Sequence, residues 1–319
     1  MSSTSKMPLA LSDLLNCFAR FWLSYNAPEK KERPRTMRNH ISRREFVSLA
    51  AAVPFLQARA PLTAQQVVDQ IKSRIGTDWK ADGVDTFKAG DPTTPVKGIA
   101  TSAMATMDVL KEAIKAGANL IITSEPTFYS RADTARTDVI STAKKDFILK
   151  NQLVVWRFSE HWRQRVPDPV TVGLAETLGW GKLRAKDDPR RIAIPNTSMD
   201  SLVSDVKKKL NSRGGIRVVG DPKLNVTKVG LLPGTTAIQA ALGLFPLVDV
   251  IIAGEVREWE TVELARDKVS ASERKSLVLL GRVVSENPGM NECAKWLKEV
   301  VPQVRTTWIP VEDPYWRPA

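Results

Sequence analysis

The sequence predicts an α/β protein with two similar domains and a cleft between them. Its 319 residues exceed the usual size of one domain and suit two. Residues 98–123 follow a β-α-β pattern, and apolar runs such as Leu120–Ile122 are typical of parallel strands covered on both faces. The pattern recurs later, because Ile99 and Glu125 are 26 residues apart, as are Val229 and Glu255. Either an internal duplication or the geometric constraint on β-α-β crossovers explains this repeat.

The first 60 residues differ in composition from the rest of the chain. Ten Lys/Arg and only four Asp/Glu give them half of the net charge of +12. Arg43 and Arg44 precede an apolar run at 48–56 and a small-x-small pattern at 58–60, which predicts a twin-arginine export signal and a periplasmic or extracellular protein. Met37 is an alternative translation start just before this signal, and with that start residues 1–36 would not belong to the protein. The apolar run is too short for a stable membrane span.

Beyond this leader, the composition argues against a nucleic-acid partner and against intrachain disulfides. The remaining positive charge is interspersed with acidic residues, so no nucleic-acid partner is expected. Cys17 lies in the leader and Cys293 stands alone, so no intrachain disulfide is expected in the mature chain. An exported protein of this kind depends on its hydrophobic core for stability.

The first domain is predicted over residues 62–188. Apolar spacing and capping residues predict its elements in this order: helix 62–75, strand 98–102, helix 108–117, strand 119–123, helix 138–151, strand 153–158 and helix 170–178.

The second domain is predicted over residues 189–319. Its expected elements are strand 191–194, helix 198–210, strand 216–219, the repeated unit with helix 237–244 and strand 249–255, strand 276–280, helix 289–300 and strand 305–309.

Carboxylates follow four of the predicted strands. These are Glu125, Glu160, Glu255 and Glu286. Ligands of parallel sheets sit beyond the carboxyl ends of the strands, where gathered carboxylates suit a hard divalent cation that activates water for hydrolysis. Glu125, Glu160 and Glu286 are therefore expected to face a shared cleft.

Several motifs resemble the Nif-three-like dinuclear-metal-centre proteins. They are Gly98–Thr101, Gly117–Pro126, Gly254–Glu255 and Gly281–Glu286, in that order. Some members of that family are described as a second type of GTP cyclohydrolase. The resemblance covers roughly residues 62–310 and implies a two-domain protomer, a ring-shaped homohexamer and two divalent metal ions between the domains.

The metal-ligand motifs depart from that family at most histidine positions. Ser124 stands where one or two histidines are usual, His161 is the only histidine left in the run 159–163, and Arg282 replaces the histidine that precedes Glu286. Arginine has no free lone pair for a metal. By resemblance, Glu125, Glu160, His161 and Glu286 remain the candidate metal ligands.

Three interpretations of this site stay open. In the first, Arg131, Arg163 and Arg282 neutralise the glutamates, and the chain is a non-catalytic scaffold. In the second, the remaining carboxylates hold metal in an active, GTP cyclohydrolase-like hydrolase. In the third, the arginines hold a small anionic ligand through bidentate hydrogen bonds.

Overall fold

The computed structural model describes residues 60–130, 133–134, 138–213 and 215–315. All of these described residues belong to one compact unit. The predicted export signal and Arg131 lie outside the described residues. Within the described part, no helix is long and apolar enough to cross a membrane.

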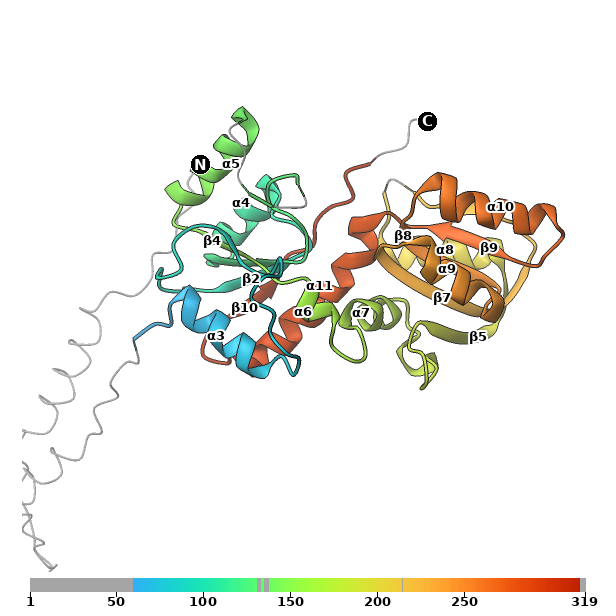
Figure 1. Cartoon of the computed structure of the whole chain (residues 1–319), viewed down its shortest axis with the longest axis horizontal. Coiled ribbons are helices and arrows are strands. Elements are labelled where there is room, and N and C mark those ends of the chain that lie inside the picture. The colour runs from blue at the N-terminus through green and yellow to red at the C-terminus, as the bar shows by residue number, and fades with distance from the viewer. Residues whose placement is uncertain (1–59, 131–132, 135–137, 214, 316–319) are drawn as a thin grey trace, which may run out of the picture. The chain divides into compact units, whose positions relative to one another are not determined.

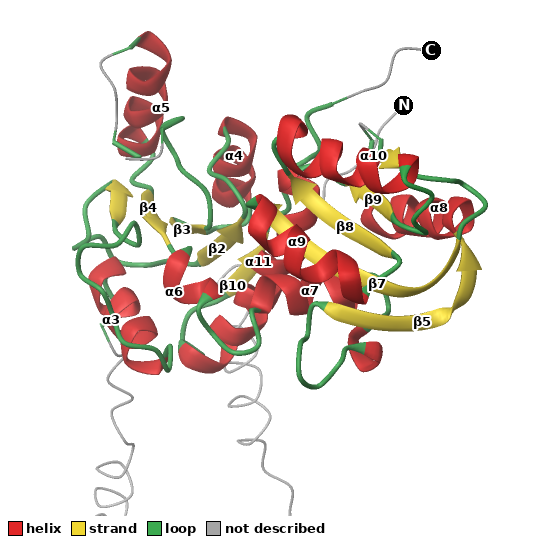
Figure 2. Cartoon of the chain, turned by 45° about the vertical axis from the view of Figure 1, so that its right-hand side comes forward, coloured by secondary structure: helices red, strands yellow, loops and turns green. Residues whose placement is uncertain are grey.

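The first sheet is mainly parallel and has five strands in the order β1-β4-β3-β2-β10. Strands β2 (Ile99–Ser102), β3 (Leu120–Thr123) and β4 (Val154–Arg157) are buried along their whole length, as the apolar runs predict. Strand β10 (Thr306–Trp308) pairs parallel to β2, and β1 (Phe87–Ala89) pairs antiparallel to β4. Figure 2 shows the four parallel strands as one layer.

Four helices accompany this sheet, and capping side chains begin three of them. They are α3 (Ala64–Arg74), α4 (Met107–Lys115), α5 (Val139–Lys150) and the short α6 (Glu160–Arg163). Thr63 and Gln66 form a capping box at α3, while Thr106 and Asp138 accept hydrogen bonds from the first turns of α4 and α5. Gly117 follows α4 with φ of +73°, a conformation that glycine adopts without strain.

The second sheet also has five strands, in the order β5-β7-β8-β9-β6. Its parallel centre consists of β7 (Asn225–Thr235), β8 (Val250–Glu255) and β9 (Ser276–Leu279). The edge strands β5 (Arg191–Ser198) and β6 (Arg217–Val219) are antiparallel. The accompanying helices are α7 (Pro169–Thr177), α8 (Met199–Leu210), α9 (Ile238–Leu244), a π-helical turn at Glu258–Val262 and α10 (Glu263–Ser270), with 3₁₀ turns at Gly181–Leu183 and Phe245–Leu247.

The sequence repeat has a structural counterpart in strand register. Ile99 pairs with Leu120 in the first sheet, and Val229 pairs with Val250 in the second. In each pair the two residues are 21 positions apart in the sequence. The predicted α/β fold with two similar layers is thus confirmed at the level of strand pairing.

Helix α11 (Arg282–Val300) connects the two layers. Its first part packs against α7 and the second sheet, whereas Met290, Cys293 and Leu297 belong to the core of the first sheet. At a rise of 1.5 Å per residue, its 19 residues span about 28 Å, enough to contact both sheets. Figure 1 shows α11 passing from the strands of one sheet to those of the other.

The segment boundaries differ from those expected at two places. Helix α11 begins at Arg282 and not at Gly289, and Pro288 lies inside it. Strand β10 joins the first sheet, although the sequence predicts its residues within a second domain at 189–319. Because α11 carries the chain back across to the first sheet, the C-terminal residues complete the layer that began at residue 62.

Candidate ion-pair site between the two sheets

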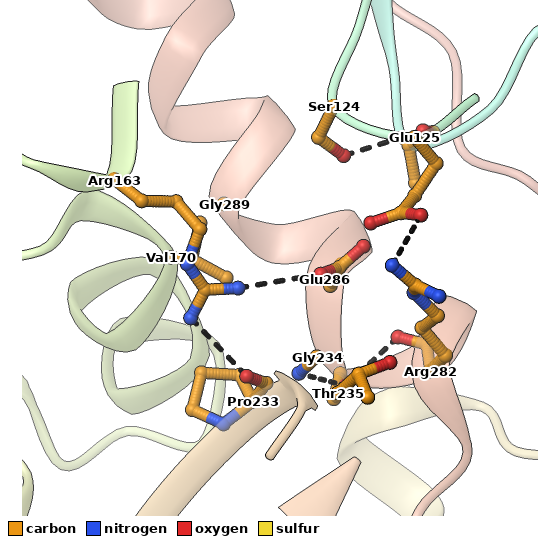
Figure 3. Close-up of polar contacts among 12 residues, drawn as sticks. Ser124, Glu125, Arg163, Val170, Pro233, Gly234, Thr235, Arg282, Glu286 and Gly289 are labelled. Atoms are coloured by element: carbon orange, nitrogen blue, oxygen red, sulfur yellow. Dashed lines mark hydrogen bonds and ion pairs between the residues drawn. The ribbon is translucent and has the colours of Figure 1, made fainter. Parts of the chain in front are cut away.

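The candidate site lies where strand ends of both sheets meet the first turns of α11. Glu125 follows β3, while Arg282 and Glu286 lie one turn apart on α11 and so share a face of that helix. Arg163 reaches the same place from the end of α6 (Figure 3). The two glutamates are about 5% exposed and the two arginines about a third. The carboxylates therefore lie beneath guanidinium groups that reach solvent.

Arg282 and Glu125 form the shortest of three ion pairs at the site, the others being those of Arg163 with Glu286 and with Asp168. Arg282 Nη2 lies 2.5 Å from Glu125 Oε2. The backbone N–H of Glu125 donates to the carbonyl of Ala103 at 2.9 Å, and the Ser124 hydroxyl donates to the same carbonyl at 3.2 Å. These bonds hold the loop after β3 so that the carboxylate of Glu125 faces α11.

Arg163 joins four segments of the chain. Its Nη1 donates to Glu286 Oε1 at 3.3 Å, and its Nη2 donates to Asp168 Oδ2 and to the Pro233 carbonyl, both at 3.2 Å. Asp168 also caps α7, because Oδ1 accepts from the backbone N–H of Val170. The guanidinium group thus ties α6, the start of α7, β7 and α11 together.

Gly234 allows the backbone to approach these side chains, and Gly254 lies directly against Gly234. A Cβ on Gly234 would lie 2.4 Å from Glu286 Oε1 and 2.7 Å from Arg163 Nη1. A Cβ on Gly254 would lie 2.3 Å from Ser285 Oγ, which accepts a hydrogen bond from the Gly234 N–H at 3.0 Å. Protein atoms therefore pack closely against the ion pairs.

Burial raises the pKa of Glu286 well above its ordinary value. The neighbouring charge of Glu125 raises it further, Arg163 opposes the change, and hydrogen bonding with Glu125 adds to it. Glu286 Oε2 and Arg282 Nε are buried without a hydrogen-bond partner among the described residues. A carboxyl group that keeps its proton suits such a position better than a second bare charge beside Glu125.

Glu160 and His161 do not join the ion pairs of Arg163 and Arg282 but lie beside Gly83 and Asp85. The Glu160 side chain is exposed beside Gly83, and its backbone N–H donates to Asp85 Oδ1 at 3.2 Å. His161 is fully buried, with Nδ1 2.7 Å from Asp85 Oδ2 and Nε2 accepting from the Lys80 N–H at 2.9 Å. Both ring nitrogens thus have hydrogen-bond partners, and the ring stacks on Trp79 with the two ring centroids 3.8 Å apart.

Neither arginine forms its ion pair with the glutamate nearest to it in the sequence. Among the described residues, Arg282 forms an ion pair with Glu125 and not with Glu286, while Arg163 forms one with Glu286 and not with Glu160. Sequence reasoning did not identify Asp168 as a site residue. An Asp before a proline that opens an apolar run is a helix-cap signal, and it could have placed Asp168 at the start of α7 beside Arg163.

The side chains of the site do not fit two metal ions. Over the described residues, no group of three or more His, Cys, Asp or Glu side chains is arranged to hold a metal. Glu125 and Glu286 are each engaged by an arginine, which cannot itself be a ligand. Borderline divalent metals favour imidazole, and His161 is held by Asp85 and Lys80.

Comparisons with known proteins identify relatives along most of the chain. The model of the Duf34/NIF3 (NGG1p interacting factor 3) family matches residues 63–314. A GTP cyclohydrolase 1 type 2 homolog of Chlamydia pneumoniae is 23% identical over 257 residues, which cover 77% of this chain and 95% of that protein.

Solved structures share the fold at low sequence identity. A hypothetical protein of Staphylococcus aureus superposes with a TM-score of 0.66 at 13% identity, covering 81% of this chain and 100% of its own. A Bacillus cereus protein related to NIF3 gives a TM-score of 0.65 at 15% identity, covering 81% of this chain and 99% of its own.

Proposed function

Because the chain belongs to the Duf34/NIF3 family, we propose that it is a member in which arginine–carboxylate pairs occupy the place of a dinuclear metal centre, and that it is a non-catalytic scaffold. The observation that carries this proposal is the pairing of Arg282 with Glu125 and of Arg163 with Glu286. The carboxyl groups of Glu125 and Glu286 thus each lie against a cationic partner supplied by the chain itself.

The charge balance of the site supports a structural role. Arg163 and Arg282 face three carboxyl groups, those of Glu125, Glu286 and Asp168. With Glu286 protonated, the two positive charges meet two negative charges. The site then has no net charge, so it exerts little electrostatic attraction on a charged substrate.

The GTP cyclohydrolase name belongs to a relative. For this chain the corresponding proposal, a metal-dependent hydrolase that uses the remaining carboxylates, requires a donor set that the two ion pairs do not provide. We therefore place it behind the scaffold role. The resemblance also supports a homohexamer, which a mass measurement of the purified assembly would test.

One observation favours a second candidate function, the binding of a small anion. Arg282 Nε is a buried donor without a partner among the described residues, and the side chain is 34% exposed. An anion that approached from solvent would meet the exposed part of the guanidinium group and compete with Glu125 for it.

Restoring imidazoles tests the main proposal. The double variant R163H/R282H places a histidine beside Glu286 and beside Glu125, so it should bind Zn²⁺ or Mn²⁺ at least about tenfold more tightly than the parent. Titration calorimetry and elemental analysis measure this. R217H is the matched control, because Arg217 forms an exposed ion pair with Glu258. Two metal ions per chain in the parent protein would refute the proposal.

Inorganic phosphate tests the second candidate. Saturable binding to the parent that R282A abolishes and R217A leaves intact would establish an anion site at Arg282. Absence of saturable phosphate binding, together with a parent that binds no metal, would leave the scaffold role as the proposal for this site.

A further inference from the structure

Strand β10 leaves one side of the first sheet without a partner strand among the described residues. The order β1-β4-β3-β2-β10 places it at an edge. On the paired side, the Ile99 N–H donates to the Arg305 carbonyl and the Ile309 N–H donates to the Thr101 carbonyl, both at 2.9 Å. Backbone groups alternate sides along a strand, so Thr306 and Trp308 present theirs to the open side.

A groove of about 550 Å³ runs along this open edge. Helix α11 forms one wall with Asn291, Ala294 and Lys298, which share a helix face by their spacing. Residues 304–308 form the other wall. The small side chain of Ala294 stands between the two longer ones, which leaves room beside the strand for another extended chain.

The charge of the groove is positive. Lys298 and Arg305 are the charged residues that line it, and both are exposed. Within the described part of the chain neither takes part in an ion pair, whereas Lys295, one turn earlier on α11, pairs with Glu292 at 2.6 Å. Two unpaired cations thus flank a strand edge that lacks a neighbour.

We propose that this groove binds an extended, acidic segment of another protein, which adds to β10 as a sixth strand while its carboxylates meet Lys298 and Arg305. The charges argue against two occupants supplied by the chain itself. The first 60 residues carry ten Lys/Arg against four Asp/Glu, and a second copy would bring the same Lys298 and Arg305 to the contact. This surface is separate from the ion-pair site, so the proposal does not depend on the function assigned there.

Binding of a defined peptide to the full-length chain tests the charge requirement. The probe is a fluorescent peptide of about eight residues, a typical strand length, that alternates Glu with Thr or Val. Fluorescence anisotropy should show saturable binding, and K298E/R305E should weaken it at least about tenfold because like charges then face each other. K295E is the matched control, because Lys295 does not line the groove, and its affinity should stay within about threefold of the parent.

Two further peptides test strand addition on the unaltered protein. Methylation of alternate backbone nitrogens removes the donors that a new strand needs and keeps every charge, so it should abolish binding. Replacing Glu by Lys should also abolish it. Equal affinity of the methylated peptide, equal affinity of K298E/R305E, or no binding of the acidic peptide at millimolar concentration would each overturn the proposal. So would a concentration-dependent assembly of the parent that K298E/R305E dissociates, since a second copy would then occupy the edge.

Discussion

Arg282 makes the carboxylate of Glu125 tolerable inside the protein. Removing one partner of a fully buried pair costs about 3–5 kcal/mol, and the one-third exposure of Arg282 reduces this. We expect R282A to lower the free energy of unfolding by about 1–3 kcal/mol in urea titrations. R217A, which breaks an ion pair whose partners are both about two-thirds exposed, should change it by less than about 1 kcal/mol. Equal effects of the two substitutions would show that Glu125 is not dependent on Arg282.

The raised pKa of Glu286 predicts a pH dependence of stability. Burial and the charge of Glu125 raise this pKa from 4.5 to about 8 in the folded protein. Between these values the folded state binds the extra proton, so the free energy of unfolding falls as the pH rises and the loss is complete above about 8. E286Q carries no titrating group and should gain stability relative to the parent between pH 5 and pH 9. E112Q, at an exposed glutamate, should follow the parent throughout. A parent and an E286Q variant with parallel profiles would contradict the assignment.

The sequence indicated which charged residues the structure brings together better than it indicated how they pair. Glu125 and Glu286 could each be placed just beyond the carboxyl end of a parallel strand, β3 in the first sheet and β9 in the second, because ligand sites form there. The partner of each arginine depends on how α6 and α11 approach in space, which local spacing does not determine. The surroundings of His161 could not be predicted for a similar reason, since Asp85, which holds it, lies 76 residues earlier.

At the scale of elements, the contact between α7 and α11 depends on two glycines. A Cβ on Gly173 would lie 2.5 Å from the Pro288 carbonyl oxygen, and a Cβ on Gly289 would lie 2.7 Å from Val170 Cα. Both obstacles are backbone atoms, so the helices would have to move apart. We expect G173A and G289A each to lower the free energy of unfolding by about 1–3 kcal/mol.

A third glycine provides the control for these helix variants. Gly243 lies within α9, and a Cβ there would meet nothing within 4 Å. Alanine favours a helix over glycine by about 1 kcal/mol, so G243A should raise stability where the other two lower it. Urea titration of the three variants measures the contrast. A stabilising G173A would mean that α7 and α11 are not in close contact in solution.

Elements with strong local signals were predicted closely, and those that depend on tertiary contact were not. The caps at Thr63, Thr106 and Asp138 set helix starts within one or two residues of the expected ones. The early start of α11 was missed because Pro288 and Gly289 are typical of helix ends. Here Gly289 instead allows α7 to approach α11 closely. The contacts of α11 with α7 and with both sheets stabilise the helix although it contains Pro288.

At the scale of the whole molecule, the export signal gives a test in cells. Arg43 and Arg44 lie outside the described residues, and their pattern predicts transport by the twin-arginine route. The double substitution R43K/R44K should retain the protein in the cytoplasm, whereas R59K, behind the apolar run, should leave export unchanged. Fractionation and immunoblotting measure the distribution. Unchanged export of R43K/R44K would refute the signal.

The return of the chain through α11 to β10 affects the order in which the molecule is completed. Strand β2 leaves the ribosome about 200 residues before its neighbour β10, because Ile99 pairs with Thr306. Until then the nascent protein holds β2 as a bare edge, and Met290, Cys293 and Leu297 are missing from the core beneath it. A premature stop codon anywhere before Thr306 would therefore leave unfinished the half of the protein that is translated first.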